Sequence, residues 1–335
     1  MISCHIVSQD LVQVAPVDAL PATPEERLAA LETAAQEYVR TQRPANTQRA
    51  YAADWKVWTR YVTQLGIPED SATAGALVGF VVWLERQEAA PATVDRRLAG
   101  AVVGLRQHGA EPPKAATEAA RAALNGYRRR LAEAGEKRGR GKAPAMEIKH
   151  LRLISAACPE TLTGIRDRAV VLIAFSIAGR RSEVAALLVS DVVEAAEGLV
   201  ITIRSGKTGG RTVAVPYGSH ESTCPVRAWR AWLDASGVTE GPAFRRIDRH
   251  GRILGVLAAQ SVGTIITTAG ERAGVTVRFT GHSARAGLAT EARRAGHDAK
   301  TISQHTGHAP NSPVLYDYMR TVDQWADNAV AGIGL

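Results

Sequence analysis

Cysteine is scarce in this chain of 335 residues, which contains only Cys4, Cys158 and Cys224. These cysteines lie far apart and lack the spacing of a zinc site or a disulfide framework. No apolar run approaches the roughly 18 residues of a membrane span. The first basic residue is Arg27, so the start of the sequence lacks the charged beginning of a signal peptide. We therefore expect a reduced, cytoplasmic protein with no membrane partner, rather than a disulfide-stabilised scaffold.

Acidic residues are the minority charge: 33 Asp and Glu stand against 41 Lys and Arg, which gives a net charge of +8 and a pI near 9.7. Such an excess favours a polyanionic partner. It is concentrated in residues 127–142, where seven basic residues face only Glu133 and Glu136. The seven are Arg128, Arg129, Arg130, Lys137, Arg138, Arg140 and Lys142. We interpret this basic cluster as a contact to the polyanion; the alternative is a solvated helix end followed by a flexible linker.

The first part of the chain predicts an all-helical domain. Residues 1–22 show no periodicity and contain two prolines, so we expect a mobile leader. A threonine, a proline and two glutamates at 23–26 then mark the start of a helix. The helices predicted within this domain, 23–134, are 25–41, 46–65, 73–88, 91–107 and 116–133. Residues 135–145 are rich in glycine and basic side chains without apolar anchors, which indicates a linker.

The remainder of the chain, 146–335, predicts a second domain of mixed pattern. Helices are expected at 147–157, 164–178, 224–236, 258–273, 282–296 and 299–306. Two β-rich runs, 198–204 and 211–216, are joined by a glycine-flanked turn and predict a small antiparallel sheet. Apolar positions in 322–335 are spaced for one face of a tail helix, which would dock on its own domain or on a second protomer. The predicted fold class is therefore mainly α with a small antiparallel β-sheet, in two domains.

Four short motifs follow one another in the second domain. They are Ala-Gly-Arg-Arg-Ser-Glu-Val (178–184), Gly-His-Ser-Ala-Arg (281–285), Thr-Gly-His (306–308) and Tyr-Met-Arg (318–320). Each resembles a box of the tyrosine recombinases, and they occur in the family's order with Lys207 in the turn between the first two. One such box would occur often by chance, whereas four in order make a specific signal. The resemblance covers about residues 25–330.

The resemblance implies a SAM-like helical core-binding domain and a catalytic domain with the DNA breaking-rejoining fold. Arg180 matches the family's first catalytic arginine, and Arg285 matches the arginine of its His-x-x-Arg box. Two guanidiniums can neutralise the non-bridging oxygens of a pentavalent phosphorane. Glu183 would hold Arg180 or a neighbouring strand from the same helix face, while Arg181 would point outward. The alternative for Arg180 and Glu183 is an ordinary surface salt bridge.

Proton transfer is assigned by the resemblance to Lys207, His282 and His308. A lysine on this hairpin acts in the family as general acid on the leaving 5′ oxygen, although hairpin turns also carry lysines for solubility. His282 precedes Arg285 by three residues, so both should project from one helix start. His308 follows Thr-Gly as in the family's box, whereas we interpret His305 as structural. Metal ligation by the histidines is the alternative, but no carboxylate or cysteine cluster accompanies them, so we expect no metal.

Two tyrosines compete for the role of nucleophile, which tyrosine performs poorly at neutral pH unless positive charge or a base assists it. The usual family spacing places this residue nine positions after the Gly-His histidine, and Asp317 occupies that position here. We prefer Tyr318 to Tyr316 because the following Met-Arg matches the family's tyrosine-hydrophobic-arginine ending. Pro310 and Pro313 are consistent with one additional loop residue before the helix.

As the resemblance implies, the chain would be a site-specific integrase that cleaves and rejoins duplex DNA through a 3′-phosphotyrosyl intermediate and a Holliday junction. No ATP, divalent metal or other cofactor would be required. A homotetramer would act on two DNA sites, and the basic cluster would contact the duplex. The protein would be cytoplasmic and associated with the nucleoid, and its further partners would be accessory DNA-bending or directionality proteins. The alternatives are a type IB topoisomerase-like nicking-closing enzyme and a catalytically inactive DNA-binding relative.

Overall fold

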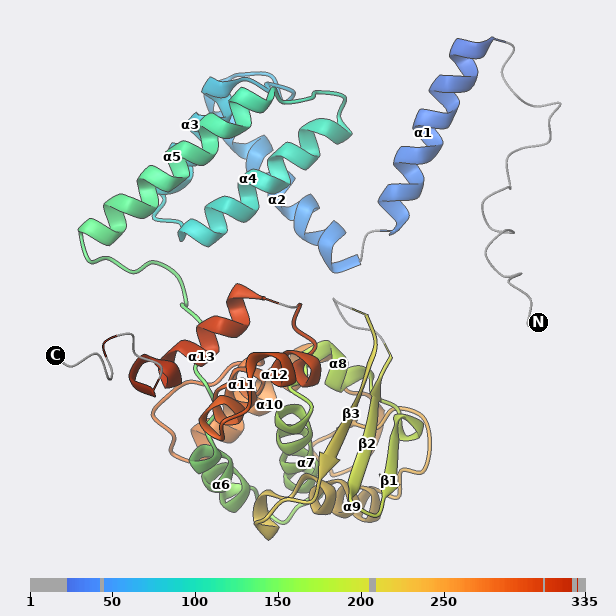
Figure 1. Cartoon of the computed structure of the whole chain (residues 1–335). Helices are drawn as coiled ribbons and strands as arrows, with labels where there is room; N and C mark the ends of the chain where they lie inside the picture. The colour runs from blue at the N-terminus through green and yellow to red at the C-terminus, as the bar shows by residue number, and fades with distance from the viewer. Residues whose placement is uncertain (1–22, 43–44, 205–208, 310, 327–329, 331–335) are drawn as a thin grey trace, which may run out of the picture. The chain divides into compact units, whose positions relative to one another are not determined.

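The chain folds as two compact units that meet in sequence between Gly141 and Lys142, a point inside the predicted linker 135–145. The computed structural model in Figure 1 describes residues 23–42, 45–204, 209–309, 311–326 and 330. The predicted leader, Lys207 and most of the predicted tail helix lie outside the described residues. No helix in the described part of the chain is both long and apolar enough to cross a bilayer.

The described part of the first unit consists of helices and their connections. The helices are α1 (Pro24–Gln42), α2 (Ala45–Leu65), α3 (Ala74–Arg86), α4 (Pro91–Gln107) and α5 (Lys114–Glu133). Local signals define their starts: Thr73 accepts the N–H of Ala76 at the start of α3, and Pro91 occupies the first position of α4. Helix α2 packs mainly against α4, and α3 packs mainly against α5.

Aromatic rings form much of the core of the first unit. Trp58, Tyr61 and Phe80 are almost completely buried, with ring centroids between 5.2 and 5.6 Å apart. The polar ends of these rings find backbone partners, because Trp58 donates to the Glu69 carbonyl and Tyr61 donates to the Ala76 carbonyl. The aromatic face of α2 is therefore a packing surface.

The second unit surrounds a buried helix with further helices and a small sheet (Figure 1). Its helices are α6 (Ile148–Ala157), α7 (Leu162–Ser176), α8 (Arg181–Ala186), α9 (Pro225–Ser236), α10 (Ala259–Arg272), α11 (Ser283–Arg294), α12 (Ala299–Thr306) and α13 (Pro313–Ala326). Residues 169–175 of α7 are all buried, and α7 contacts α6, α9, α10 and α11. The end of α7 therefore lies deep in this unit, where the residues that follow it can reach several other elements.

Two antiparallel sheets complete the second unit. The first has the order β1 (Val192–Ala195), β2 (Gly198–Ile203) and β3 (Arg211–Pro216). The second pairs β4 (Arg245–Ile247) with β5 (Ile253–Val256). Strand β3 alternates in burial, with Val213 and Val215 facing the core.

The architecture is mainly helical with small antiparallel sheets, as the sequence predicts, with differences in detail. The helix predicted at 164–178 ends at Ser176, because Ala178 adopts a left-handed backbone conformation with φ of 47°. Strand β1 and the β4–β5 hairpin were not predicted, because strands of three or four residues are too short for a recognisable alternation.

Candidate active site

The turn after α7 positions the first arginine of the predicted site. Ala178 reverses the chain, and Gly179 allows a close approach, since an added Cβ there would lie 2.7 Å from Cγ2 of Val184. Arg180 then precedes α8, and its backbone N–H donates to Oε2 of Glu183 at 3.0 Å. The guanidinium of Arg180 also pairs with Glu183. The two residues thus meet at a helix start, and not on one face of a continuous helix as expected.

Glu183 holds two arginines at once. Its side chain is only 1% exposed, and Oε2 accepts a hydrogen bond from Nη2 of Arg211 at 3.0 Å. Burial alone would raise the pKa of Glu183, but the hydrogen bonds from Arg211 and Arg180 outweigh burial and hold this pKa below its usual value. Glu183 is therefore a buried carboxylate with charged partners on both oxygens.

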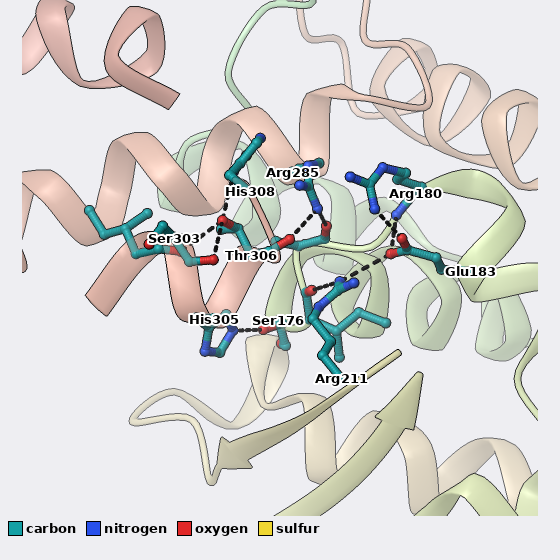
Figure 2. Close-up of polar contacts among 12 residues, drawn as sticks. Ser176, Arg180, Glu183, Arg211, Arg285, Ser303, His305, Thr306 and His308 are labelled. Carbon is teal, nitrogen blue, oxygen red and sulfur yellow. Dashed lines mark hydrogen bonds and ion pairs between the residues drawn. The ribbon is translucent and has the colours of Figure 1, made fainter. Parts of the chain in front are cut away.

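Arg285 ties two distant segments together from within α11. Its side chain is buried, and Nη1 donates to the carbonyl of Ala178 at 2.8 Å and to the carbonyl of Thr306 at 2.5 Å (Figure 2). The Nη2 atom is buried without a hydrogen-bond partner among the described residues. Burial, and then the charge of Arg180, lower the pKa of Arg285 to about 10. An anion bound here would relieve both penalties on the cation.

His282 lies directly before α11 and is exposed on one side. Desolvation of its ring, followed by the guanidiniums of Arg181 and Arg285, lowers the pKa of His282. Arg181, which was expected to point outward, is half-buried and donates to Oε1 of Gln260 at 2.8 Å. It crosses Gly281 so closely that a Cβ at this glycine would lie 2.1 Å from Cδ of Arg181.

His308 is held in one tautomer by a chain of hydrogen bonds. Oγ1 of Thr306 lies 2.7 Å from the carbonyl oxygen of Ile302 and 2.7 Å from Nδ1 of His308 (Figure 2). Because the hydroxyl donates its one proton to the carbonyl, Nδ1 of His308 carries a hydrogen and donates to Thr306. Burial and the nearby charge of Arg285 lower the pKa of His308 to about 4. The ring is therefore neutral at pH 7, with Nε2 as a proton acceptor.

Tyr318 lies on the buried side of α13. It packs with Leu315 and Met319 against α11 and α12, and its ring centroid is 6.2 Å from that of His308. Tyr316 is 41% exposed, since positions two apart on a helix point about 200° away from each other. The structure therefore brings Tyr318, and not Tyr316, to Arg285 and His308, which together with Arg180 and Glu183 form the site cluster.

Charges of opposite sign surround the hydroxyl of Tyr318. Burial raises the pKa of Tyr318, Arg285 and Lys142 lower it, and Asp317 raises it further. Lys142 pairs with Asp317 at 2.8 Å, so the first residue of the second unit neutralises the carboxylate beside the predicted nucleophile. This places Lys142 beside Tyr318 rather than with the other basic residues of 127–142.

Three further points of the sequence analysis concern Lys207, His305 and metal ligands. Lys207 falls on residues that the structure does not describe. His305 hydrogen-bonds the carbonyl oxygen of Ser176 through Nε2 at 2.7 Å, and Figure 2 shows it on the opposite side of Thr306 from His308. Within residues 23–42, 45–204, 209–309 and 311–326, no three His, Cys, Asp or Glu side chains group as metal ligands.

Most of the predicted basic cluster is engaged within its own unit. The pairs are Arg128 with Asp95 (2.7 Å), Arg129 with Glu133 (3.9 Å), Arg130 with Glu85 (2.7 Å) and Arg138 with Glu136 (3.1 Å). Other basic residues lie on one face of α2 and are exposed. They are Arg49, Lys56 and Arg60, which are spaced by seven and four residues. The charge of the 127–142 segment is therefore less available to a polyanion than the sequence suggested.

Arg211, which the sequence analysis did not identify, also belongs to the group of charged residues around Glu183. It opens β3 at a position that shares its face with the buried Val213 and Val215. A charged residue on the apolar face of an alternating strand is the signal that was available, because such a residue must find partners inside the protein.

Comparisons with known proteins place these residues in a family. The model of the Phage integrase family matches residues 145–324. The chain is 30% identical over 294 residues to an integrase/recombinase xerD homolog of Selenomonas ruminantium, covering 85% of this chain and 84% of that protein. It is also 31% identical over 179 residues to the tyrosine recombinase XerD of Corynebacterium glutamicum, covering 51% and 55%.

Solved structures show the same fold at low sequence identity. The Tn1549 transposon integrase in complex with transposon right end DNA aligns with a TM-score of 0.57 and 13% identity, covering 86% of this chain and 92% of that one. A lambda integrase dimer bound to a COC′ core site aligns with a TM-score of 0.54 and 14% identity, covering 87% and 94%.

Proposed function

Because the chain belongs to the Phage integrase family, we propose that it is a site-specific DNA recombinase in which Tyr318 attacks the scissile phosphate. The observation that carries this proposal is the convergence of Arg180, Arg285, His308 and Tyr318 from four separate segments. Their charges act on one another, since Arg285 lowers the pKa of both His308 and Tyr318. Such coupled titratable groups are typical of catalytic sites.

The two arginines are suited to bind the phosphate. Burial, and then the charge of Arg180, lower the pKa of Arg285 to about 10, so the fold by itself disfavours this cation. A phosphate would supply the missing counter-charge and an acceptor for the unpartnered Nη2 of Arg285. Arg180 would contribute the donors that Glu183 does not use. The transition state, which carries more charge on its non-bridging oxygens than the ground state, would gain more from these groups.

His308 is suited to accept the proton of Tyr318. Its Nδ1 donates to Thr306, which leaves the lone pair of Nε2 as the acceptor. In the protein alone the ring is a weak base, because its burial and then the charges of Arg285 and Arg180 lower the pKa of His308. A bound phosphate raises the basicity of His308 by offsetting these charges. The proton of the Tyr318 hydroxyl would then pass to Nε2 as the tyrosine oxygen bonds to phosphorus.

The bond from phosphorus to the 5′ oxygen breaks in the same step. By resemblance to the family, Lys207 donates a proton to this leaving oxygen, which gives a free 5′-hydroxyl and a 3′-phosphotyrosyl protein. The energy of the phosphodiester is retained in this ester, so resealing requires neither ATP nor a metal. Attack by the 5′-hydroxyl of a partner duplex would then proceed through a Holliday junction in a homotetramer.

The first unit would hold the duplex through phosphate contacts. We assign this role to Arg49, Lys56 and Arg60 of α2 in addition to Lys137 and Arg140, because arginines already paired with acids must first lose those partners. The fold neighbours that are bound to DNA support a DNA duplex as the partner. The location in the cytoplasm and any accessory protein remain part of this proposal.

A suicide duplex tests the proposal directly. The protein first selects its binding site from random-sequence DNA, and the selected duplex is then nicked beside the scissile phosphate so that the cleaved fragment diffuses away. In EDTA, the wild type and Tyr316→Phe should form a covalent protein–DNA adduct, whereas Tyr318→Phe should bind without forming one. An adduct from Tyr318→Phe would refute the assignment of the nucleophile, and relaxation of plasmids that lack the selected site would favour a topoisomerase-like enzyme.

A further inference from the structure

Arg211 connects two segments of the predicted active site without lying in any of the recognised motifs. Its side chain is 10% exposed, and Nη2 donates to Oε2 of Glu183 at 3.0 Å and to the carbonyl of Ile177 at 2.9 Å. Figure 2 shows Arg211 on the side of Glu183 away from Arg180. The residue is thus bonded to the turn and the helix start that present Arg180.

The same side chain packs against the segment that presents His308. Gly307 has a φ of 65°, and an added Cβ at this position would lie 3.1 Å from Cδ and 3.3 Å from Nη1 of Arg211. The left-handed conformation and the narrow gap both favour glycine. Arg211 also contributes to the lowered pKa of His308, after burial, Arg285 and Arg180. Its cation therefore acts on the base as well as on Arg180.

The sharing of Glu183 explains how Arg211 would influence Arg180. One oxygen of Glu183 accepts from the guanidinium of Arg180, while the other accepts from Arg211 and from the backbone N–H of Arg180. If Arg211 were absent, Oε2 would lose its charged partner, and the guanidinium of Arg180 would be the nearest replacement. Two contacts to Glu183 would turn the donors of Arg180 away from the phosphate.

We propose that Arg211 is a positioning residue for strand cleavage, which holds Glu183 and the Gly307 turn so that Arg180 and His308 reach the same phosphate. Arg211 does not itself contact DNA in this scheme, because its guanidinium is enclosed by Ile177, Glu183 and Gly307. The inference rests on the proposed function, since it names a residue that supports the same cleavage step.

The test compares Arg211→Met and Arg211→Lys with a matched control, Arg166→Met. Arg166 is also a buried arginine of the second unit, pairing with Asp167 at 2.6 Å, but it lies ten residues before the end of α7, roughly 15 Å along the axis. We expect Arg211→Met to reduce single-turnover cleavage by about 10- to 100-fold, the effect of a small misplacement of catalytic groups. Binding of the duplex should stay within about twofold, and Arg211→Lys should cleave at an intermediate rate.

Two readouts separate positioning from general destabilisation. In the double variant with Arg180→Met, the Arg211 substitution should add less than about threefold to the loss, because residues that act through one another are not additive. On a duplex with an uncharged methylphosphonate at the scissile position, the defects of Arg211→Met and Arg180→Met should shrink together, since less charge remains to be neutralised. Any reduction of the cleavage rate by Arg166→Met should be the same on the ordinary duplex and on the methylphosphonate duplex.

Several outcomes would overturn the inference. They are wild-type cleavage by Arg211→Met, equal loss of binding and cleavage, full additivity with Arg180→Met, or a pattern that matches Arg166→Met. An NMR titration in the absence of DNA measures the pKa of His308 without requiring cleavage. It therefore tests the placement of Arg211 independently of the proposed function. Arg211→Met should raise the pKa of His308, and an unchanged pKa would contradict the placement of the Arg211 cation beside the segment of His308. If this pKa rises but the wild type forms no adduct at Tyr318, the proposed function fails while the arrangement around Arg211 holds.

Discussion

Replacement of Arg285 by methionine should separate the stability of the second unit from its chemistry. The change removes the guanidinium but keeps an unbranched apolar side chain. It leaves the carbonyls of Ala178 and Thr306 without their donor, which destabilises the fold by about 1–3 kcal/mol for each buried carbonyl. The loss from this cause is therefore about 2–6 kcal/mol.

An opposing effect comes from the charge itself. The pKa of Arg285 is lowered to about 10, against an ordinary value of about 12.5. The folded protein therefore disfavours this cation by about 3 kcal/mol. A neutral methionine does not carry this cost, so the substitution stabilises the fold by about the same amount. The second effect offsets half or more of the first, so Arg285→Met should be destabilised by no more than about 3 kcal/mol. Cleavage should fall by about 100- to 1,000-fold, as when one donor to a developing anion is removed.

Urea unfolding and single-turnover cleavage of the suicide duplex measure the two quantities on the same preparation. Arg166→Met is the control, because it removes a buried arginine and leaves Asp167 with only the more distant Arg272 at 3.7 Å among the described ion pairs. This variant should be destabilised by about 3–5 kcal/mol, yet cleave normally at temperatures where it is folded. Wild-type cleavage by Arg285→Met, or a destabilisation above about 5 kcal/mol, would refute the reasoning.

Three further predictions concern protons and salt. Lys207→Ala should regain cleavage on a duplex with a 5′-thiolate leaving group, which needs no general acid; absence of rescue would move the acid role to His282. Because the pKa of His308 falls to about 4 in the folded state, below its unfolded value of about 6.5, the unfolded chain binds the extra proton first. Wild-type stability should therefore decrease relative to His308→Gln as the pH falls from about 7 to 4, and parallel stability curves would contradict this pKa. DNA binding measured in EDTA should weaken with salt by a log–log slope of roughly 0.9 per phosphate contact, and a flat response would contradict electrostatic binding.

Local patterns in the sequence were enough to determine most helices and the identity of the motifs. Caps, prolines and periodic apolar positions act within a few residues, so the start of α4 at Pro91 and the extent of β3 could be predicted directly. The four motifs also indicated the family, because they occur in the order in which the family has them. The Tyr-Met-Arg ending favoured Tyr318 over Tyr316, although spacing alone placed Asp317 at the expected position.

Tertiary structure decided which charged side chains are available and which are not. Arg128 and Arg130 lie in a run of three arginines, but their acidic partners lie 33 and 45 positions away. Arg211 meets Glu183 across 28 positions, and no local rule connects a strand start to a distant helix start. Pairing of charges depends on where the chain returns in space, whereas motifs depend only on order along the chain. The sequence by itself therefore determined the family and the candidate residues, and only the fold determined which arginines are already paired with acids.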